Sequence, residues 1–195
     1  MSNGYIIETT GDLKVIRFSR PEIRSPLSIA VLEGLHGVID RIAADTSVVG
    51  LIFSGTDDVF ASGADLREIG RVTGKTAREF ALRGQTLMSR ISDLHCKTVA
   101  AVNGFCFGGA LDLALACDMR IASPNALFSH PGASLGIMTG WGGTQRLPRM
   151  IGEAAAIEMF FTGRRVNAAE ALTLGLVDAV ADDPVPSAIR IVENG

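Results

Sequence analysis

Apolar residues recur along the first third of the chain in two spacings, one typical of strands and one of helices. Residues 5–8 and 13–18 have strand character on either side of a Thr-Gly-Asp turn, which predicts an opening β-hairpin. Residues 28–44 carry apolar side chains at helical spacing, and residues 48–54 form the apolar run of a buried strand. This part of the chain therefore predicts two paired strands, a helix and a buried strand.

The same alternation continues through the middle of the chain. The predicted elements are a helix over residues 76–94, a strand over 97–102, a short apolar helix over 109–116 and a short strand over 119–122. Before them lies a more polar stretch, residues 67–75, in which Gly70 and Gly74 disfavour a rigid helix; it is a candidate lid. Strands that alternate with helices predict an α/β fold with a mostly parallel sheet covered by helices.

The last third of the chain predicts two more helices, over residues 153–161 and 168–174. Asn167 and Glu170 have the spacing of a capping box at the start of the second helix, and Gly175 is a candidate stop. The segment Ala-Asp-Asp-Pro-Val-Pro after residue 180 predicts a break in structure. We therefore expect one domain over residues 1–195, with a core of about residues 5–180 and a short tail over 181–195.

Composition and charge narrow the class of protein. A chain of 195 residues that is 47% hydrophobic can bury one sizeable core and is too short to require two domains. The formal net charge is −3 and basic residues are scattered singly, which argues against a nucleic-acid partner. No apolar run has the length of a membrane span and the N-terminus has no secretion pattern, so we expect a cytoplasmic protein with no membrane partner.

No motif for a metal or a separate cofactor is visible in the sequence. Cys96, Cys106 and Cys117 lack the spacing of a metal site and are expected to be buried apolar groups. There is no glycine-rich dinucleotide fingerprint and no phosphate-binding loop, and the serines and three histidines form no recognisable triad. We therefore expect neither a metal nor a redox cofactor.

Two glycine-containing segments carry the candidate chemistry. Residues 103–112, Asn-Gly-Phe-Cys-Phe-Gly-Gly-Ala-Leu-Asp, follow an apolar strand and open a helix, where unpaired backbone N–H groups favour a negative oxygen. Residues 60–66, Phe-Ala-Ser-Gly-Ala-Asp-Leu, follow the preceding strand and are placed to direct another N–H to the same point. Two such amides form an oxyanion hole, which stabilises the charge that develops on a carbonyl oxygen.

Together the two segments resemble the crotonase (enoyl-CoA hydratase/isomerase) superfamily. The similarity extends to residues 16–22, to residues 142–149, and to several short motifs between residues 158 and 177. The resemblance implies a crotonase-like spiral of ββα repeats, an acyl-CoA substrate that brings coenzyme A with it, and a trimer-based assembly. It also implies a C-terminal helical segment, which this chain would largely lack. The apolar surface that this segment would cover is then exposed unless another copy of the chain packs against it, so we expect a homo-oligomer.

The resemblance assigns the oxyanion hole to particular residues. The expected donors are the backbone amides of Ala64 and Gly109. The expected neighbours of the substrate in the same two segments are Ser62, Asp65, Leu66 and Gly108. The alternative interpretation is that both glycine-rich stretches are only tight turns between strand and helix.

Three larger side chains are candidates for substrate binding. Arg24 stands where the family often has a basic residue near the CoA phosphates, and Arg67 follows the first oxyanion turn. For each of them a solvated surface arginine is the alternative. Trp141 stands where hydratases commonly have a small residue, so that it either narrows the acyl pocket or packs between helices.

Proton transfer depends on Asp112, His130 and Gly132. Asp112 interrupts an apolar helix where the hydratase pattern usually has a glutamate, so its carboxylate is either catalytic or structurally hydrogen-bonded. Gly132 follows Pro131 where the pattern reads Pro-Glu, and the missing general acid or base argues against ordinary hydration. His130 would lie on the same side as Gly132 if this stretch is extended, and is either a substitute base or a surface residue.

The sequence therefore predicts an acyl-CoA enzyme of the hydratase/isomerase type, a lyase or isomerase that stabilises an enolate. A 1,3-proton shift needs only one base, so isomerisation tolerates Gly132 better than hydration does. Two alternatives stay open: a decarboxylase of malonyl-type thioesters, which needs no base, and a non-catalytic protein that binds CoA thioesters. The sequence specifies neither the acyl chain nor the pathway.

Overall fold

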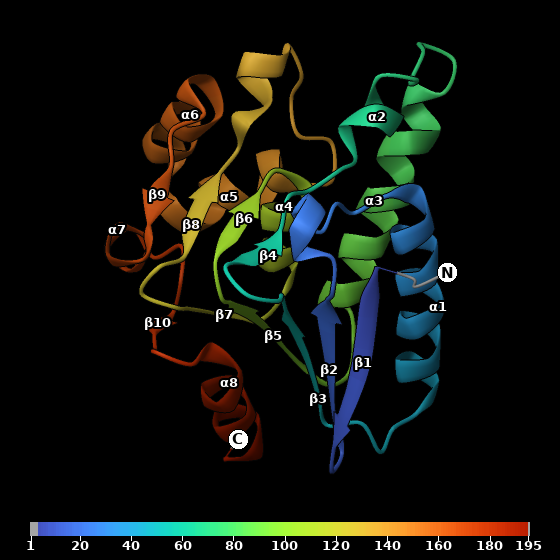
Figure 1. Ribbon diagram of the computed structural model, residues 1–195, viewed down its shortest axis with the longest axis vertical. Coiled ribbons are helices and arrows are strands. Elements are labelled where there is room, and N and C mark those ends of the chain that lie inside the picture. Colours follow the sequence, from blue (N-terminus) through green and yellow to red (C-terminus); the bar gives the residue numbers. More distant parts are fainter. Residues whose placement is uncertain (1–3, 195) are drawn as a thin grey trace.

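The computed structural model describes residues 4–194, and its strands form two sheets (Figure 1). The larger sheet has the order β1-β2-β3-β5-β7-β10, and its strands are parallel except for β1. These strands are β1 (Tyr5–Thr10), β2 (Leu13–Phe18), β3 (Gly50–Ser54), β5 (Lys97–Val102), β7 (Met119–Ala122) and β10 (Ala179–Val180). The smaller sheet consists of β4 (Val59–Ala61), β6 (Phe105–Phe107), β8 (Leu127–Ser129) and β9 (Val166–Asn167), in that order.

Helices follow the strands in a regular sequence. The α-helices are α1 (Ile29–Ala44), α2 (Leu66–Ile69), α3 (Ala77–Ser92), α4 (Gly109–Ala116), α5 (Gly143–Ile151), α6 (Glu153–Thr162), α7 (Ala168–Thr173) and α8 (Pro184–Glu193), with short 3-10 helices η1 (Pro21–Ile23) and η2 (Pro131–Leu135). The strand pairs β3/β4, β5/β6 and β7/β8 each place one strand in each sheet and are each followed by helix. The chain thus spirals through ββα repeats, which confirms the expected fold class.

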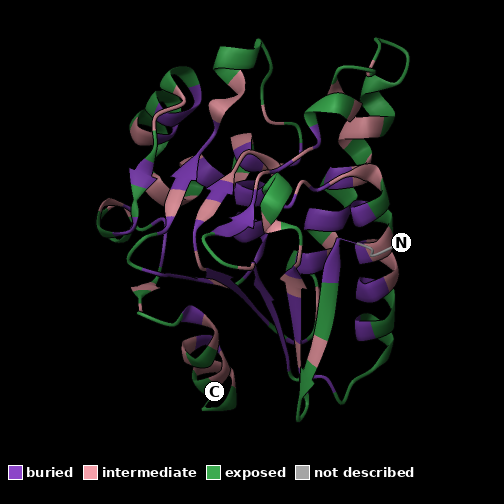
Figure 2. Cartoon of the chain, in the orientation of Figure 1, coloured by how far each residue is buried: buried purple, intermediate pink, exposed green. Residues whose placement is uncertain are grey.

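The central strands of the larger sheet, β3, β5 and β7, are buried on both faces. In β3, Leu51 and Phe53 join the main core with α1, α3 and α4, whereas Ile52 joins a second cluster under α8. Alternate side chains of a strand point to opposite faces, so a strand covered on both sides is apolar at every position. Figure 2 shows β3, β5 and β7 as almost entirely buried.

Helix α8 lies where the sequence predicted a break in structure and a short tail. Asp183 caps this helix by accepting a hydrogen bond from the Val185 amide at 3.3 Å. Pro184 is the first helical residue, a position that needs no amide donor and where the fixed φ of proline suits the helix. The prediction was wrong because the prolines mark the start of a helix that covers one face of the sheet.

Several shorter elements were also absent from the sequence prediction. Helix α5 has glycines at its start and Pro148 near its end, so its sequence resembles a loop. Helix α2 occupies the beginning of the candidate lid, and turns rather than a regular element fill most of the rest. The strands of the smaller sheet have two or three residues each, too few to show a period.

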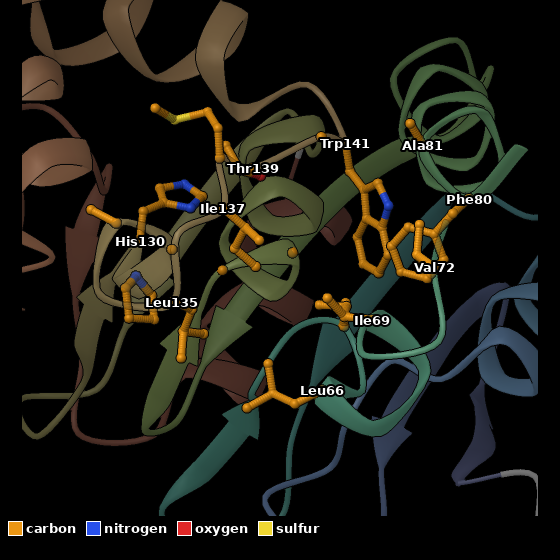
Figure 3. Close-up of a pocket in the computed structure, with 18 of the residues that line it drawn as sticks. Leu66, Ile69, Val72, Phe80, Ala81, His130, Leu135, Ile137, Thr139 and Trp141 are labelled. Carbon is orange, nitrogen blue, oxygen red and sulfur yellow. The ribbon is translucent and has the colours of Figure 1, made fainter. Parts of the chain in front are cut away.

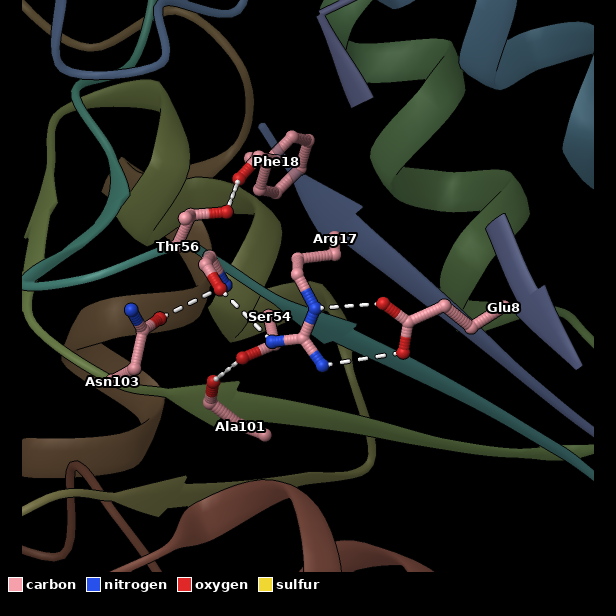
Figure 4. A network of polar contacts seen from close by, with 8 residues as sticks. Glu8, Arg17, Phe18, Ser54, Thr56, Ala101 and Asn103 are labelled. Carbon is pink, nitrogen blue, oxygen red and sulfur yellow. Dashed lines mark hydrogen bonds and ion pairs between the residues drawn. The ribbon is translucent and has the colours of Figure 1, made fainter. Parts of the chain in front are cut away.

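A polar network fixes the loop that leads from β3 to β4 (Figure 4). The Arg17 guanidinium donates to Glu8 at 2.9 Å and to the Gly55 carbonyl at 3.1 Å. The Asn103 side chain accepts a hydrogen bond from the Gly55 amide at 2.9 Å, and the Thr56 hydroxyl donates to the carbonyl of the last residue of β2 at 2.8 Å. These bonds tie the loop to β1, β2 and the end of β5, and so set the direction in which β4 leaves the larger sheet.

Residues 4–194 contain no helix that is both long and apolar enough to cross a membrane. In the same part of the chain, no group of three or more His, Cys, Asp or Glu side chains is arranged to hold a metal ion. Cys96, Cys106 and Cys117 are buried and free, as their apolar contexts predicted.

Candidate active site

Candidate residues follow directly after three neighbouring strands of the smaller sheet. β4 leads into residues 62–64, β6 leads into Gly108 and Gly109, and β8 leads into His130. β6 pairs in parallel with both of the other strands. Because the carboxyl ends of parallel strands lie at the same edge, residues far apart in the sequence meet there, which is the usual place for a ligand site in such a sheet.

The two oxyanion segments are in direct contact. A Cβ atom on Gly63, whose φ is +81°, would lie 2.6 Å from both the Gly109 nitrogen and the Phe107 carbonyl oxygen. Only glycine allows this approach. Gly108 also has a positive φ, and its amide donates to the carbonyl of the last residue of β8 at 2.9 Å. The turn before Ala64 is thereby packed against the start of α4.

The amides of Ala64 and Gly109 are both available to a ligand. Gly109 is the first residue of α4, where the amides have no acceptor within the helix. Ala64 forms a bridge with Leu27, but the Leu27 amide donates to the Gly63 carbonyl, at 2.7 Å, and leaves the Ala64 amide unused. Between residues 4 and 194, neither amide has a protein acceptor outside its own element. The geometry therefore fits a pair of oxyanion donors.

A cavity of about 390 Å³ lies beside the two turns, and its wall is mostly apolar. Helices α2 and α3 form one side, and η2 with the loop after it forms another (Figure 3). The lining residues labelled there are Leu66, Ile69, Val72, Phe80, Ala81, His130, Leu135, Ile137, Thr139 and Trp141. Ser62, Ala64, Gly108, Gly109 and Gly132 line the same cavity. Such a wall suits an apolar acyl group next to a carbonyl group.

Among the residues that line this cavity, His130 is the only one with an ionisable side chain. Its ring is 3% exposed and packs against the Phe160 ring, with centroids 5.0 Å apart. Burial lowers the pKa of His130 to about 4, so the imidazole is neutral at pH 7. The following residues form η2, so the extended conformation on which the prediction for His130 depended was wrong, although the side chain does face the cavity.

Asp112 lies behind the cavity wall and is 0% exposed. The Thr139 hydroxyl donates a hydrogen bond to Asp112 Oδ2, and Asp112 Oδ1 lies 3.4 Å from His130 Nε2. Burial raises the pKa of Asp112 to about 6; the Thr139 hydrogen bond, the Trp141 amide and the Arg146 charge oppose that shift. The carboxylate therefore touches the group that faces the cavity rather than the cavity itself.

Gly132 lines the cavity but has no room for a side chain. A Cβ atom there would lie 2.5 Å from the Ile137 carbonyl oxygen. The Ile137 amide also donates to the Gly132 carbonyl at 3.0 Å, which closes a tight turn around this position. The carboxylate that the family pattern would place at this position is thus excluded by the backbone.

Trp141 both packs between helices and lines the cavity. A Cβ atom on Gly84 in α3 or on Gly109 in α4 would come within 2.3 Å of its ring, so the indole fills the space that two glycines leave. Its ring centroid is 5.9 Å from that of Phe80 on the neighbouring wall. The two interpretations of Trp141 are therefore compatible.

Arg24, Asp65 and Arg67 lie outside the cavity wall. The Arg24 guanidinium lies 5.1 Å from the centre of the Phe105 ring. Asp65 caps α2 by accepting from the Arg67 amide at 2.9 Å, and it pairs with the Arg67 guanidinium at 2.6 Å. The Arg67 guanidinium lowers the pKa of Asp65 below its usual value. Arg67, one of the two arginines expected to meet phosphate, is thus paired with its neighbour, and phosphate contacts of Arg24 and Arg67 stay a prediction.

Sequence reasoning missed Thr139, Phe80 and Phe160. Thr139 is a single polar residue in a loop of apolar residues and glycines, which was the only signal for it. Phe80 and Phe160 lie on helices whose apolar spacing identifies a buried face but not which cavity that face borders.

Known proteins share both the sequence pattern and the fold. Residues 8–190 match the model of the enoyl-CoA hydratase/isomerase family. The chain is 38% identical over 181 residues to a short-chain-enoyl-CoA hydratase of Clostridium acetobutylicum, covering 92% of this chain and 69% of that protein. It is 42% identical over 170 residues to the mitochondrial enoyl-CoA hydratase domain-containing protein 2 of Mus musculus, covering 86% of this chain but 57% of that protein.

Solved structures give the same result. An enoyl-CoA hydratase from Bacillus anthracis superposes with a TM-score of 0.92 at 34% identity, covering 98% of this chain and 76% of that one. An enoyl-CoA hydratase from Thermoplasma volcanium has a TM-score of 0.93 at 31% identity, covering 99% and 77%. The chain thus spans between half and four fifths of the length of these relatives.

Proposed function

The chain belongs to the enoyl-CoA hydratase/isomerase family, and we propose that it binds an acyl-CoA thioester with the carbonyl oxygen between the amides of Ala64 and Gly109. The contact between the two glycine turns carries this proposal, because it brings both donors to one edge of the cavity. Losing one such donor typically costs about 2.7–4 kcal/mol of transition-state stabilisation. The apolar wall accepts the acyl group, and coenzyme A arrives as part of the substrate.

A 1,3-proton shift is the reaction that this cavity supports best, because the wall offers one ionisable side chain. His130 takes a proton from C2 of a 3-enoyl thioester. The electrons of the broken C–H bond move toward the carbonyl oxygen, and the resulting dienolate is held by the two amides. His130 then returns the proton to C4, which gives the 2-enoyl thioester with no other reactant.

Hydration of a 2-enoyl thioester is the second candidate, because the relatives of this chain include hydratases. Addition of water requires a proton to leave water and another to reach C2. Gly132 supplies no second group for this, and a lost general acid or base is worth about 10²–10⁴ in rate. We therefore expect hydration to be slow.

The test compares three substrates with the purified protein: 3-hexenoyl-CoA, crotonyl-CoA and methylmalonyl-CoA. Isomerisation of 3-hexenoyl-CoA that is faster than hydration of crotonyl-CoA supports the proposal, whereas rapid hydration with slow isomerisation contradicts it. Loss of CO₂ from methylmalonyl-CoA with no isomerisation would identify a decarboxylase. Tight thioester binding without any turnover would identify a non-catalytic binding protein.

A further inference from the structure

Two buried polar atoms meet behind the cavity wall. Within the described residues, Asp112 Oδ1 and His130 Nε2 are buried atoms without a hydrogen-bond partner. They lie 3.4 Å apart, slightly farther than in an ordinary N–H···O hydrogen bond, so a small movement of either side chain would let a proton on Nε2 reach the carboxylate. Because a buried polar group without a partner costs free energy, a hydrogen bond between these two atoms would stabilise both.

The carboxylate is held so that one oxygen faces the histidine. The Thr139 hydroxyl donates to Oδ2, and the backbone amides of Trp141 and Gly143 also favour the ionised carboxyl. Oδ1 is the oxygen that lies toward His130 Nε2. Asp112 lies in α4, the helix that starts with the proposed oxyanion donor Gly109, and His130 follows directly after β8. The carboxylate and one oxyanion donor thus lie in α4 and the histidine follows β8, and both of these elements contact β6.

We propose that Asp112 and His130 act as one unit, in which His130 is the catalytic base and Asp112 is a positioning residue that never touches the substrate. This inference rests on the proposed function. Asp112 Oδ1 holds the proton on Nε2, so the lone pair on Nδ1 is the one that accepts a proton from the substrate carbon. In a histidine that acts as a base, a hydrogen bond at one ring nitrogen determines which nitrogen carries the proton and leaves the other free to accept one.

Charge balance favours the same assignment. With the carboxylate ionised and the imidazole neutral, the buried pair carries a charge of −1. Once His130 accepts the substrate proton, the pair becomes an imidazolium next to a carboxylate, with no net charge, while the negative charge moves to the enolate oxygen. The charge of Arg146 also acts on Asp112 and favours the carboxylate. Burial, with a smaller effect of the Asp112 charge, raises the pKa of Cys106 well above its ordinary value, so its thiol stays protonated.

The substitution Asp112→Asn tests this role, and Asp182→Asn is the matched control. Both replace a carboxylate by an amide, but Asp182 is exposed and lies just before α8, which packs on the opposite face of the larger sheet from α4. For Asp112→Asn we expect kcat for 3-hexenoyl-CoA isomerisation to fall by about 10²-fold or more, with KM little changed, because the oxyanion hole and the cavity wall remain. The control should retain the kinetic constants of the unaltered protein.

The pH profile separates positioning from a merely structural role. In the unaltered protein, kcat/KM should decline as the pH falls through about 6, where the Asp112 carboxyl takes up a proton. In Asp112→Asn that decline should move to lower pH, because only the imidazole remains to titrate and burial lowers its pKa to about 4. Residual activity with an unshifted profile would overturn the proposal.

Nitrogen NMR supplies a readout that does not depend on turnover. The chain has three histidines, so His130→Gln assigns the His130 signals by difference. We expect the Nε2–H tautomer in the unaltered protein and a mixture or the other tautomer in Asp112→Asn. An Nδ1–H tautomer in the unaltered protein would overturn the proposal. A protein that shows the expected tautomer and binds thioesters but isomerises none would contradict the proposed function instead.

Discussion

Replacing Gly109 by proline removes one of the two amides proposed to hold the enolate oxygen. Proline suits the first position of a helix, so the backbone of α4 tolerates it. The structure adds a complication: a Cβ atom at this position would lie 2.3 Å from the Trp141 ring. A fall in activity of Gly109→Pro alone would therefore combine a lost donor with a displaced indole.

A matched pair of variants separates the two effects. Trp141→Leu removes the ring atoms that a Cβ atom would meet, and Gly109→Ala and Gly109→Pro are then compared in that background. Both variants add a Cβ atom, but only alanine keeps the amide hydrogen. One oxyanion donor is worth about 2.7–4 kcal/mol, so kcat should be about 10²–10³-fold lower with proline than with alanine.

The assay is isomerisation of 3-hexenoyl-CoA under saturating substrate, with circular dichroism and thermal unfolding to verify that both variants fold. Binding of an unreactive thioester is measured alongside, because an oxyanion donor acts mainly on the transition state. Equal kcat values for the folded proline and alanine variants would refute the assignment of the Gly109 amide. A difference confined to KM would also contradict it, because that is the result of lost ground-state binding.

Three further outcomes are expected. Gly132→Glu should not confer rapid hydration. It should destabilise the protein by about 1–3 kcal/mol in urea unfolding, because any Cβ atom at this position meets the Ile137 carbonyl. Gly132→Ala should show a similar loss of stability for the same reason. Asp112 has a folded-state pKa of about 6 against an ordinary 3.8, so its contribution to stability falls by about 3 kcal/mol as the pH rises from about 4 to 6. Urea unfolding at pH 4 and pH 8 measures this fall, and Asp112→Asn should abolish it. The opposite contribution of His130 remains in both proteins. An identical pH dependence of stability in the variant and the unaltered protein would contradict this. Light scattering should show a homo-oligomer, because α6 and α7 carry exposed apolar side chains such as Phe161, which is 72% exposed; a monomer at high micromolar concentration would contradict this.

The longer elements could be predicted from the sequence because their signals are local. The predicted boundaries of β2, β5, α4 and β7 match the structure, and those of α1, α3, α6 and α7 differ by at most two residues at either end. In each of them the signal lies in the segment itself: helical spacing of apolar residues, a short apolar run, or a cap such as Asn167, whose side chain accepts from the Glu170 amide. The two oxyanion segments were visible for the same reason, since glycine at a strand-to-helix turn is a local requirement.

Only the tertiary structure decided which of those segments meet, and what each side chain faces. Gly63 contacts the Gly109 nitrogen because β4 and β6 are paired in a sheet whose strands are too short to show a pattern. Asp112 interrupts an apolar helix in the sequence, but its place behind His130 depends on η2 and on Thr139, from another part of the chain. Gly132 lacks room because of a carbonyl five residues away, and α8 forms because the sheet offers an apolar face to cover. Sequence spacing records how a residue relates to its neighbours along the chain, whereas burial, pKa and distance are set by neighbours in space.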